Sequence, residues 1–285
     1  MSRIPIRILE RLTPYFLLLP ALVVFGGIFV TPVVRAFMDS LAGRDGALGI
    51  DQYRRMFETA YGGDLLFTLA IGFGAASLSV LISIPIALVL RRPFQGRTLL
   101  YALVLFPLVV PHIIAAYGLW LSMGRGGPVF NLITTIGLLD RAPMLSREPT
   151  GLLIALVWKH FPITTLTIAA ALESIDPALE EAGRDLGAGP MRRLAEIVLP
   201  LAIPGLLAGF VLVFILSASG FSIPLIVYSG KQIQPLPLGI YYEALAKDDW
   251  AFASALGVAL TTASLVLLGI LTTAIRRIYR ESLAH

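Results

Sequence analysis

Two ionisable side chains, Lys159 and His160, fall in the middle of an apolar stretch of the sequence. A charge inside hydrocarbon is costly and usually faces protein or water, so both residues are candidates for contact with a transported solute. Two other interpretations stay open. The lysine could extend toward the outer membrane interface, or the run from Trp158 to Pro162 could be structural.

A later apolar stretch holds further candidates for lining a path, with close helix packing as the alternative. These are Ser217, Ser219 and Phe221.

Residue patterns for catalysis and for metal binding are absent from the sequence. Gly230 and Lys231 are followed by Gln232, so the Ser or Thr that completes a phosphate-binding loop is missing. The three histidines lie too far apart in the sequence to suggest a local metal site. They are His112, His160 and His285. We therefore expect no catalytic residue, no metal and no cofactor in this chain, which is not expected to be an enzyme.

The composition is that of an integral membrane protein. The 285 residues are 57% hydrophobic and only 14% charged, with a mean hydropathy of +0.84, and a soluble domain is less apolar and more charged. The net charge of +4 needs no nucleic-acid partner to explain it, because basic loops orient membrane proteins. Cysteine is absent, which excludes disulfides and cysteine metal sites but identifies no compartment.

Six apolar stretches are each long enough to cross roughly 30 Å of hydrocarbon as a helix. We therefore predict an all-α, polytopic membrane protein with six transmembrane helices. Residues 1–14, with an arginine at every fourth position, are expected to form a cytoplasmic anchor, and residues 15–285 a single transmembrane domain. The predicted spans cover residues 15–38, 65–90, 98–122, 151–172, 202–227 and 251–275.

The distribution of Lys and Arg predicts the orientation. The two termini and the loops 91–97 and 173–199 carry 12 basic residues in 58, whereas the three opposite loops carry 8 in 76. The more basic side of a membrane protein faces the cytoplasm. Both termini are therefore expected inside the cell, together with the segment 173–200, in a protein of the bacterial cytoplasmic (inner) membrane.

The segment 173–200 is the only long charged segment between two strongly apolar ones. Asp176 followed by Pro177 predicts a helix start, because an Asp side chain accepts from free first-turn amides and Pro needs no donor there. The helix should run toward Leu186 and end at Gly187, since glycine permits a left-handed exit. A second short helix is predicted over residues 191–199.

This segment resembles a known signature. It is similar to the EAA motif (EAA, three residues, G, nine residues, I-x-LP) of the membrane-spanning subunits of binding-protein-dependent ABC importers. Gly183 replaces the third-position alanine, a change that loosens a helix by roughly 1 kcal/mol at most. The matching residues are Glu181, Ala182, Gly187, Ile197, Leu199 and Pro200.

The resemblance implies a fold and partners. In that family the segment forms a coupling helix that inserts into a cytoplasmic ATPase subunit, and a type I importer permease fold is expected. Partners would be two ATP-binding subunits that hold ATP and Mg²⁺, a second permease subunit that is a different chain, a periplasmic or extracellular solute-binding protein, and lipid. Coupling is expected to depend on Glu181, Ala182, Gly183, Asp185 and Gly187.

The sequence determines the transported solute less well than it determines the class of transporter. From the second span onward the chain looks like the spermidine/putrescine permease branch, which implies a small polar, polyamine-like solute, with iron(III), thiamine and 2-aminoethylphosphonate permeases close by. No Asp or Glu lies inside a predicted span to attract a polycation, whereas Lys159 favours an anion. An ion-coupled secondary transporter, with Lys159 as the coupling group, is the alternative function.

Overall fold

The structure is a computed structural model that describes residues 17–43, 48–136, 145, 148–228 and 232–282. It divides into two compact units, Met1–Thr59 with Ile240–Ala259, and Ala60–Gly239 with Leu260–His285. The predicted anchor over residues 1–14 lies outside the described residues. In the described part of the chain, five helices are long and apolar enough to cross a membrane, and a sharply bent pair supplies the sixth span if it counts as one.

The first unit contains a long apolar helix, Leu17–Ser40, which includes a π-helical turn, η1 (Gly26–Val30), and α2 (Thr31–Ser40). It also contains α3 (Asp51–Glu58), η4 (Tyr242–Ala246) and the start of α14 (Trp250–Ser282). The predicted first and sixth spans therefore correspond to observed helices.

Arg55 joins segments of this unit that are far apart in the sequence. Its Nη1 donates to Asp249 Oδ2 at 2.6 Å, and its guanidinium lies 3.9 Å from the centre of the Phe252 ring. Glu243, which is buried, accepts from Lys247 Nζ at 2.8 Å. The contacts of Arg55 fix α3 against the beginning of α14.

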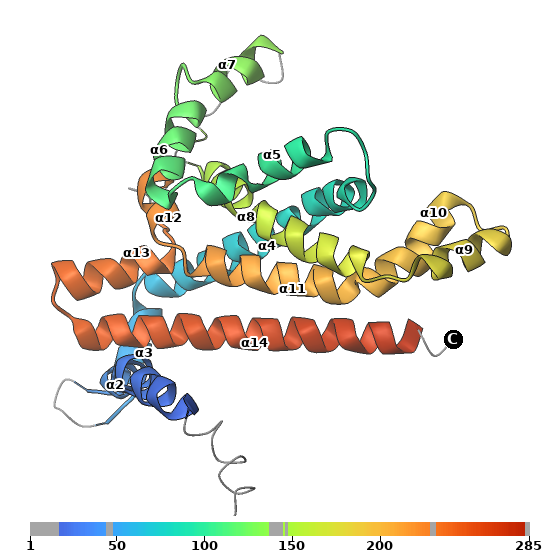
Figure 1. Cartoon of the computed structure of the whole chain (residues 1–285). Coiled ribbons are helices and arrows are strands. Elements are labelled where there is room, and N and C mark those ends of the chain that lie inside the picture. The colour runs from blue at the N-terminus through green and yellow to red at the C-terminus, as the bar shows by residue number, and fades with distance from the viewer. Residues whose placement is uncertain (1–16, 44–47, 137–144, 146–147, 229–231, 283–285) are drawn as a thin grey trace, which may run out of the picture. The chain divides into compact units, whose positions relative to one another are not determined.

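The second unit is built on three helices that pack against one another: α4 (Tyr61–Leu90), α8 (Pro149–Glu173) and α11 (Leu199–Ala218). Figure 1 shows α8 and α11 side by side. All three are apolar on every side, as expected for helices inside a membrane. Their buried residues form three apolar clusters along the bundle.

Small residues allow α11 to approach α8 closely. A Cβ added at Gly205 would lie 2.3 Å from Ala171 Cβ and 2.9 Å from the Thr167 carbonyl oxygen. At Gly209 the added atom would lie 2.5 Å from Thr167 Oγ1. The Gly205 and Gly209 pair, four residues apart, is thus a packing face within this chain.

The predicted third span is not one straight helix. It consists of α5 (Arg97–Val109) and α6 (His112–Met123), which are bent by 102° at the intervening residues. Pro111 has no amide hydrogen, so the Pro107 carbonyl lacks its usual helical donor. Val110 precedes a proline and is extended, as that position favours. The predicted span over 98–122 is therefore made of two helices and not of one.

Lys159 of α8 supplies the missing donors at this break. Its side chain is only 2% exposed, and Nζ donates to the carbonyl oxygens of Pro107 and Val110, each at 2.6 Å. An amine at the C-terminal end of α5 also faces the negative end of the helix dipole. The lysine therefore supplies hydrogen-bond donors to the carbonyl groups at the C-terminal end of α5.

The predicted fifth span is broken as well. Its helix ends at Ala218, and a short helix, α12 (Ser222–Val227), follows after a gap. Pro224 cannot donate to the carbonyl of Gly220, and glycine itself favours a break. The predicted span over 202–227 therefore consists of a long helix and a short one. The remaining elements of this unit are α7 (Pro128–Thr135), α9 (Pro177–Asp185), α10 (Pro190–Arg193), η3 (Leu194–Val198) and α13 (Leu236–Tyr241), the last ending in the other unit.

Replacing Gly205 by alanine is expected to destabilise the protein by about 1–3 kcal/mol, because the new methyl group has no room against α8. Thermal unfolding in detergent measures the loss. Gly269 of α14 is the matched control, because nothing lies within 4 Å of its added Cβ, and Gly269→Ala should be neutral or slightly stabilising. An equal response of the two variants would contradict this packing.

Replacing Lys159 by methionine keeps much of the apolar stem but removes the donor to two buried carbonyls. Each buried acceptor left unpaired costs about 1–3 kcal/mol, so we expect a lower unfolding temperature and faster hydrogen exchange over residues 112–116. Lys159→Arg, which keeps N–H donors, should restore part of the protection. Unchanged exchange in the methionine variant would show that the break does not depend on Lys159.

Candidate functional site

Helix α9 begins and ends as its sequence predicts. Asp176 accepts from the amide of Ala178 at 2.9 Å, and Pro177 is the first helical residue. Gly187 has a φ of +82°. Its amide donates to Arg184 O, and the next amide donates back to Gly183 O, both at 2.9 Å. This pair of hydrogen bonds is a Schellman motif, which fixes the exit of the helix.

The second helix of the segment differs from the prediction. Instead of a separate helix over 191–199, a single helix of 29 residues runs from Pro190 to Ala218 and includes α10, η3 and α11. The π-helical turn η3 lets the amide of Leu199 donate to Leu194 O. This wider turn accommodates Pro200, which has no donor, without ending the helix. The α9–α10 hairpin (residues 177–193) is thus continuous with a membrane span.

Four of the five residues expected to carry coupling lie on the surface of the hairpin. Glu181, Ala182, Asp185 and Gly187 are exposed, whereas Gly183 is buried. A Cβ at Gly183 would lie 2.7 Å from Ile197 Cδ1. Glycine at the third position of the motif therefore permits close packing of α9 on η3, although the flexible end of Ile197 could move aside for alanine.

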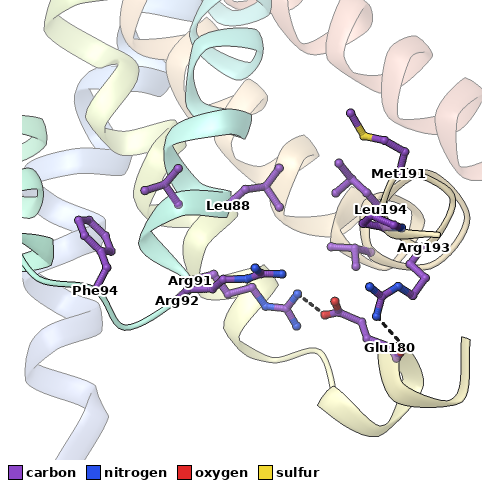
Figure 2. A pocket seen from close by; sticks show the side chains of 11 residues that line it. Leu88, Arg91, Arg92, Phe94, Glu180, Met191, Arg193 and Leu194 are labelled. Carbon is purple, nitrogen blue, oxygen red and sulfur yellow. Dashed lines mark hydrogen bonds and ion pairs between the residues drawn. The ribbon is translucent and has the colours of Figure 1, made fainter. Parts of the chain in front are cut away.

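The sequence analysis did not single out Glu180, which ties the hairpin to α4. Its carboxylate forms an ion pair with Arg91, and Arg193 Nη1 donates to its carbonyl oxygen at 3.3 Å. Figure 2 shows Glu180 between these two arginines. The signal in the sequence was the opposite charge of Arg91 and Arg92 directly after the second span, in a loop predicted on the same side of the membrane.

Large apolar side chains are exposed on the hairpin. Leu186 is 89% exposed and Met191 is 79% exposed, and Leu179 is also exposed. Apolar residues exposed on a charged hairpin outside the membrane spans are typical of a surface that another protein covers.

A second candidate site is a cavity of about 290 Å³ where α6, α8, α11 and α12 meet. His160, Ser219 and Phe221, all predicted from the sequence, line it. His112 and Ser222 were not predicted as members of this cavity, because only the packing of α6 and α12 against each other and against α8 brings them to it. No carboxylate lines the cavity in the described part of the chain.

The other two predicted path residues lie beside the cavity. Ser217 Oγ is 3.2 Å from His160 Nδ1, within hydrogen-bond distance. Lys159 faces the α5–α6 break and does not line the cavity. The rings of His112 and His160 are 6.4 Å apart, but no third potential ligand completes a metal site among the described residues. The cavity can offer neutral hydrogen-bonding groups to a polar solute.

Comparison with known proteins identifies the class. Residues 79–284 match the family described as the inner membrane component of binding-protein-dependent transport systems. The spermidine/putrescine permease PotB of Haemophilus influenzae is 27% identical over 94% of this chain and 91% of its own length. The putative 2-aminoethylphosphonate permease PhnU of Salmonella typhimurium is also 27% identical, over 85% of this chain and 86% of its own.

Solved structures share the fold. A chain of the bacterial alginate ABC transporter, solved in complex with a periplasmic protein carrying an alginate pentasaccharide, superposes with a TM-score of 0.77 at 22% identity, covering 98% of this chain and 99% of its own. A chain of the MetNI methionine ABC transporter gives a TM-score of 0.55 at 21% identity, over 76% and 94% of the two chains. The fold and the resemblance inferred from the EAA-like motif are confirmed. This chain belongs to the binding-protein-dependent transport system inner membrane components, and it is a multi-pass permease subunit of an ABC importer of the bacterial inner membrane.

Proposed function

We propose that the α9–α10 hairpin transmits ATP-driven motion from a separate ATPase subunit to the membrane spans. The observation that supports this most is the absence of any linker between the hairpin and α11: one helix of 29 residues, roughly 43 Å long, joins them. The Schellman motif at Gly187 fixes α9 against α10. A displacement of α9 is therefore passed to the bundle as a movement of a rigid helix.

The ion pair between Arg91 and Glu180 gives this motion a second route. It joins the hairpin to the end of α4, which also packs against α8 and α11. Both side chains are partly buried, at 17% and 23% exposure, so solvent screens the pair less than a surface ion pair. Two of the three central helices thus follow the hairpin together.

ATP and Mg²⁺ belong to the partner in this proposal. Two ATP-binding subunits hydrolyse ATP, a second permease chain completes the pathway, and a soluble binding protein delivers the solute from outside. Both termini and the hairpin lie in the cytoplasm, as the distribution of basic residues predicts. Closure of the ATPase subunits opens the cavity near His160 outward, and their separation opens it inward.

The solute is a small polar molecule, and a polyamine is the first candidate because PotB relatives are named for spermidine and putrescine. PhnU is named for 2-aminoethylphosphonate at the same identity, so sequence similarity does not separate the two. None of the described residues that line the cavity has a carboxylate to hold a polycation. Selection among solutes therefore rests mainly with the binding protein.

Reconstitution tests the proposed function. Proteoliposomes containing the chain and its ATPase, permease and binding-protein partners should accumulate radiolabelled spermidine only with internal ATP, with 2-aminoethylphosphonate as the second solute. Accumulation driven by an ion gradient without ATP would instead indicate secondary transport, the alternative in which Lys159 couples an ion. Omitting the binding protein is the control, and it should abolish uptake.

Replacing Gly187 by valine should uncouple transport. A β-branched residue at a φ of +82° introduces about 1–3 kcal/mol of strain, although nothing within 4 Å would block the side chain. We expect normal membrane insertion and continued ATP hydrolysis, but strongly reduced uptake. Gly187→Asn is the matched control, because asparagine tolerates this backbone conformation better. Undiminished ATP-dependent uptake by the valine variant would count against the role of the hairpin exit.

A further inference from the structure

A cavity larger than the one near His160 lies beside the α9–α10 hairpin and not in the bundle. Its volume is about 470 Å³, and it is formed by the last turn of α4, the loop that follows, α9, α10 and η3. Figure 2 shows arginine side chains on the same wall as apolar residues. None of the coupling or path residues expected from the sequence lines it.

The charges of this cavity are unbalanced. Arg91, Arg92 and Arg193 line it, and Glu180 is the only acid among its described lining residues. That carboxylate is already paired with Arg91. Arg92 is exposed and forms no ion pair with any residue that the structure describes. The buried Nε of Arg193 has no hydrogen-bond partner among the described residues. The Arg92 guanidinium is therefore available to an anion, and Arg193 adds a second positive charge to the same cavity.

The apolar part of the cavity continues the surface of two membrane spans. Leu88 and Val89 belong to the last turn of α4, and Leu194 and Val198 lie where the helix of α11 begins. Val89 is 51% exposed, and Phe94 beside it is also exposed. A ligand that fits this surface needs an acyl chain as well as an anionic group. A free phosphate would leave the apolar wall uncovered.

We propose that this cavity binds an anionic phospholipid of the surrounding leaflet. The phosphate contacts Arg92 and Arg193, whose planar guanidinium groups match phosphate oxygens in two-point hydrogen bonds. One acyl chain lies along Val89 and Leu194. Basic pockets between transmembrane helices on the cytoplasmic side are suited to such headgroups. The position in the cytoplasmic leaflet rests on the orientation given under the proposed function.

The bound lipid would regulate coupling. It lies between the end of α4 and the α10–η3 helix, beside the Arg91 and Glu180 ion pair that joins α4 to α9. Occupancy therefore adds contacts between the two helices that carry the motion of the hairpin. Uptake per ATP hydrolysed should be higher in membranes that contain anionic lipid.

The test uses the full-length chain in nanodiscs of phosphatidylcholine with or without phosphatidylglycerol, and native mass spectrometry to count retained lipid. A basic residue near an anionic lipid strengthens attraction about fivefold, so Arg92→Gln should weaken retention of phosphatidylglycerol by about that factor. Arg192→Gln is the matched control: it removes one charge from α10, beside Arg193 of the cavity, but Arg192 does not line the cavity and is paired with Glu196. The Arg192→Gln variant should retain as much phosphatidylglycerol as the unsubstituted chain.

Three results would overturn the proposal. Equal retention of phosphatidylglycerol and phosphatidylcholine would show that no anionic headgroup is recognised. Displacement of the lipid by millimolar inorganic phosphate alone would show a simple anion site. A loss of ATPase association by Arg92→Gln in pure phosphatidylcholine would assign the surface to the protein partner. Lipid retention is measured without ATP and without a partner chain. A failure of lipid binding is therefore distinguishable from a failure of ATP-dependent uptake, because either result can occur without the other.

Discussion

A backbone carbonyl inside hydrocarbon needs a donor from the protein, and the prolines of this chain remove several such donors. Pro111 leaves the carbonyl of Pro107 without its helical partner, and Lys159 from the neighbouring helix α8 donates to it. A lysine buried in a span is costly on its own. Here the cost of burying the amine is offset, because the carbonyl groups at the break in the third span accept its hydrogen bonds.

The positions of the helix breaks determine which spans are rigid and where the cavity near His160 forms. His112 begins α6 immediately after Pro111, and Phe221 lies in the gap between α11 and α12. Both residues line the same cavity as His160. In contrast, the helix from Pro190 to Ala218 passes Pro200 and Pro204 without a break. Broken spans thus surround the cavity, while an unbroken one connects it to the hairpin.

Local signals in the sequence predicted the elements better than the contacts between them. Asp176, Pro177 and Gly187 act within a few residues of themselves, so their cap and exit were predictable and are confirmed. The contact of Lys159 with Pro107 joins residues 52 positions apart, and only the packing of α5 on α8 brings them together. For the same reason the sequence analysis treated His112 and His160 as unrelated, although their rings are 6.4 Å apart.

The groups in the central cavity suit a permease that passes its solute on without holding it tightly. Histidine and serine offer hydrogen bonds to many polar solutes, and the amine of Lys159 beside the cavity already donates to two backbone carbonyls. A carboxylate in the cavity would bind a polyamine strongly, but a conduction site must also release its solute. Relatives named for such different solutes as spermidine and 2-aminoethylphosphonate are consistent with a shared bundle whose selectivity is supplied by another subunit.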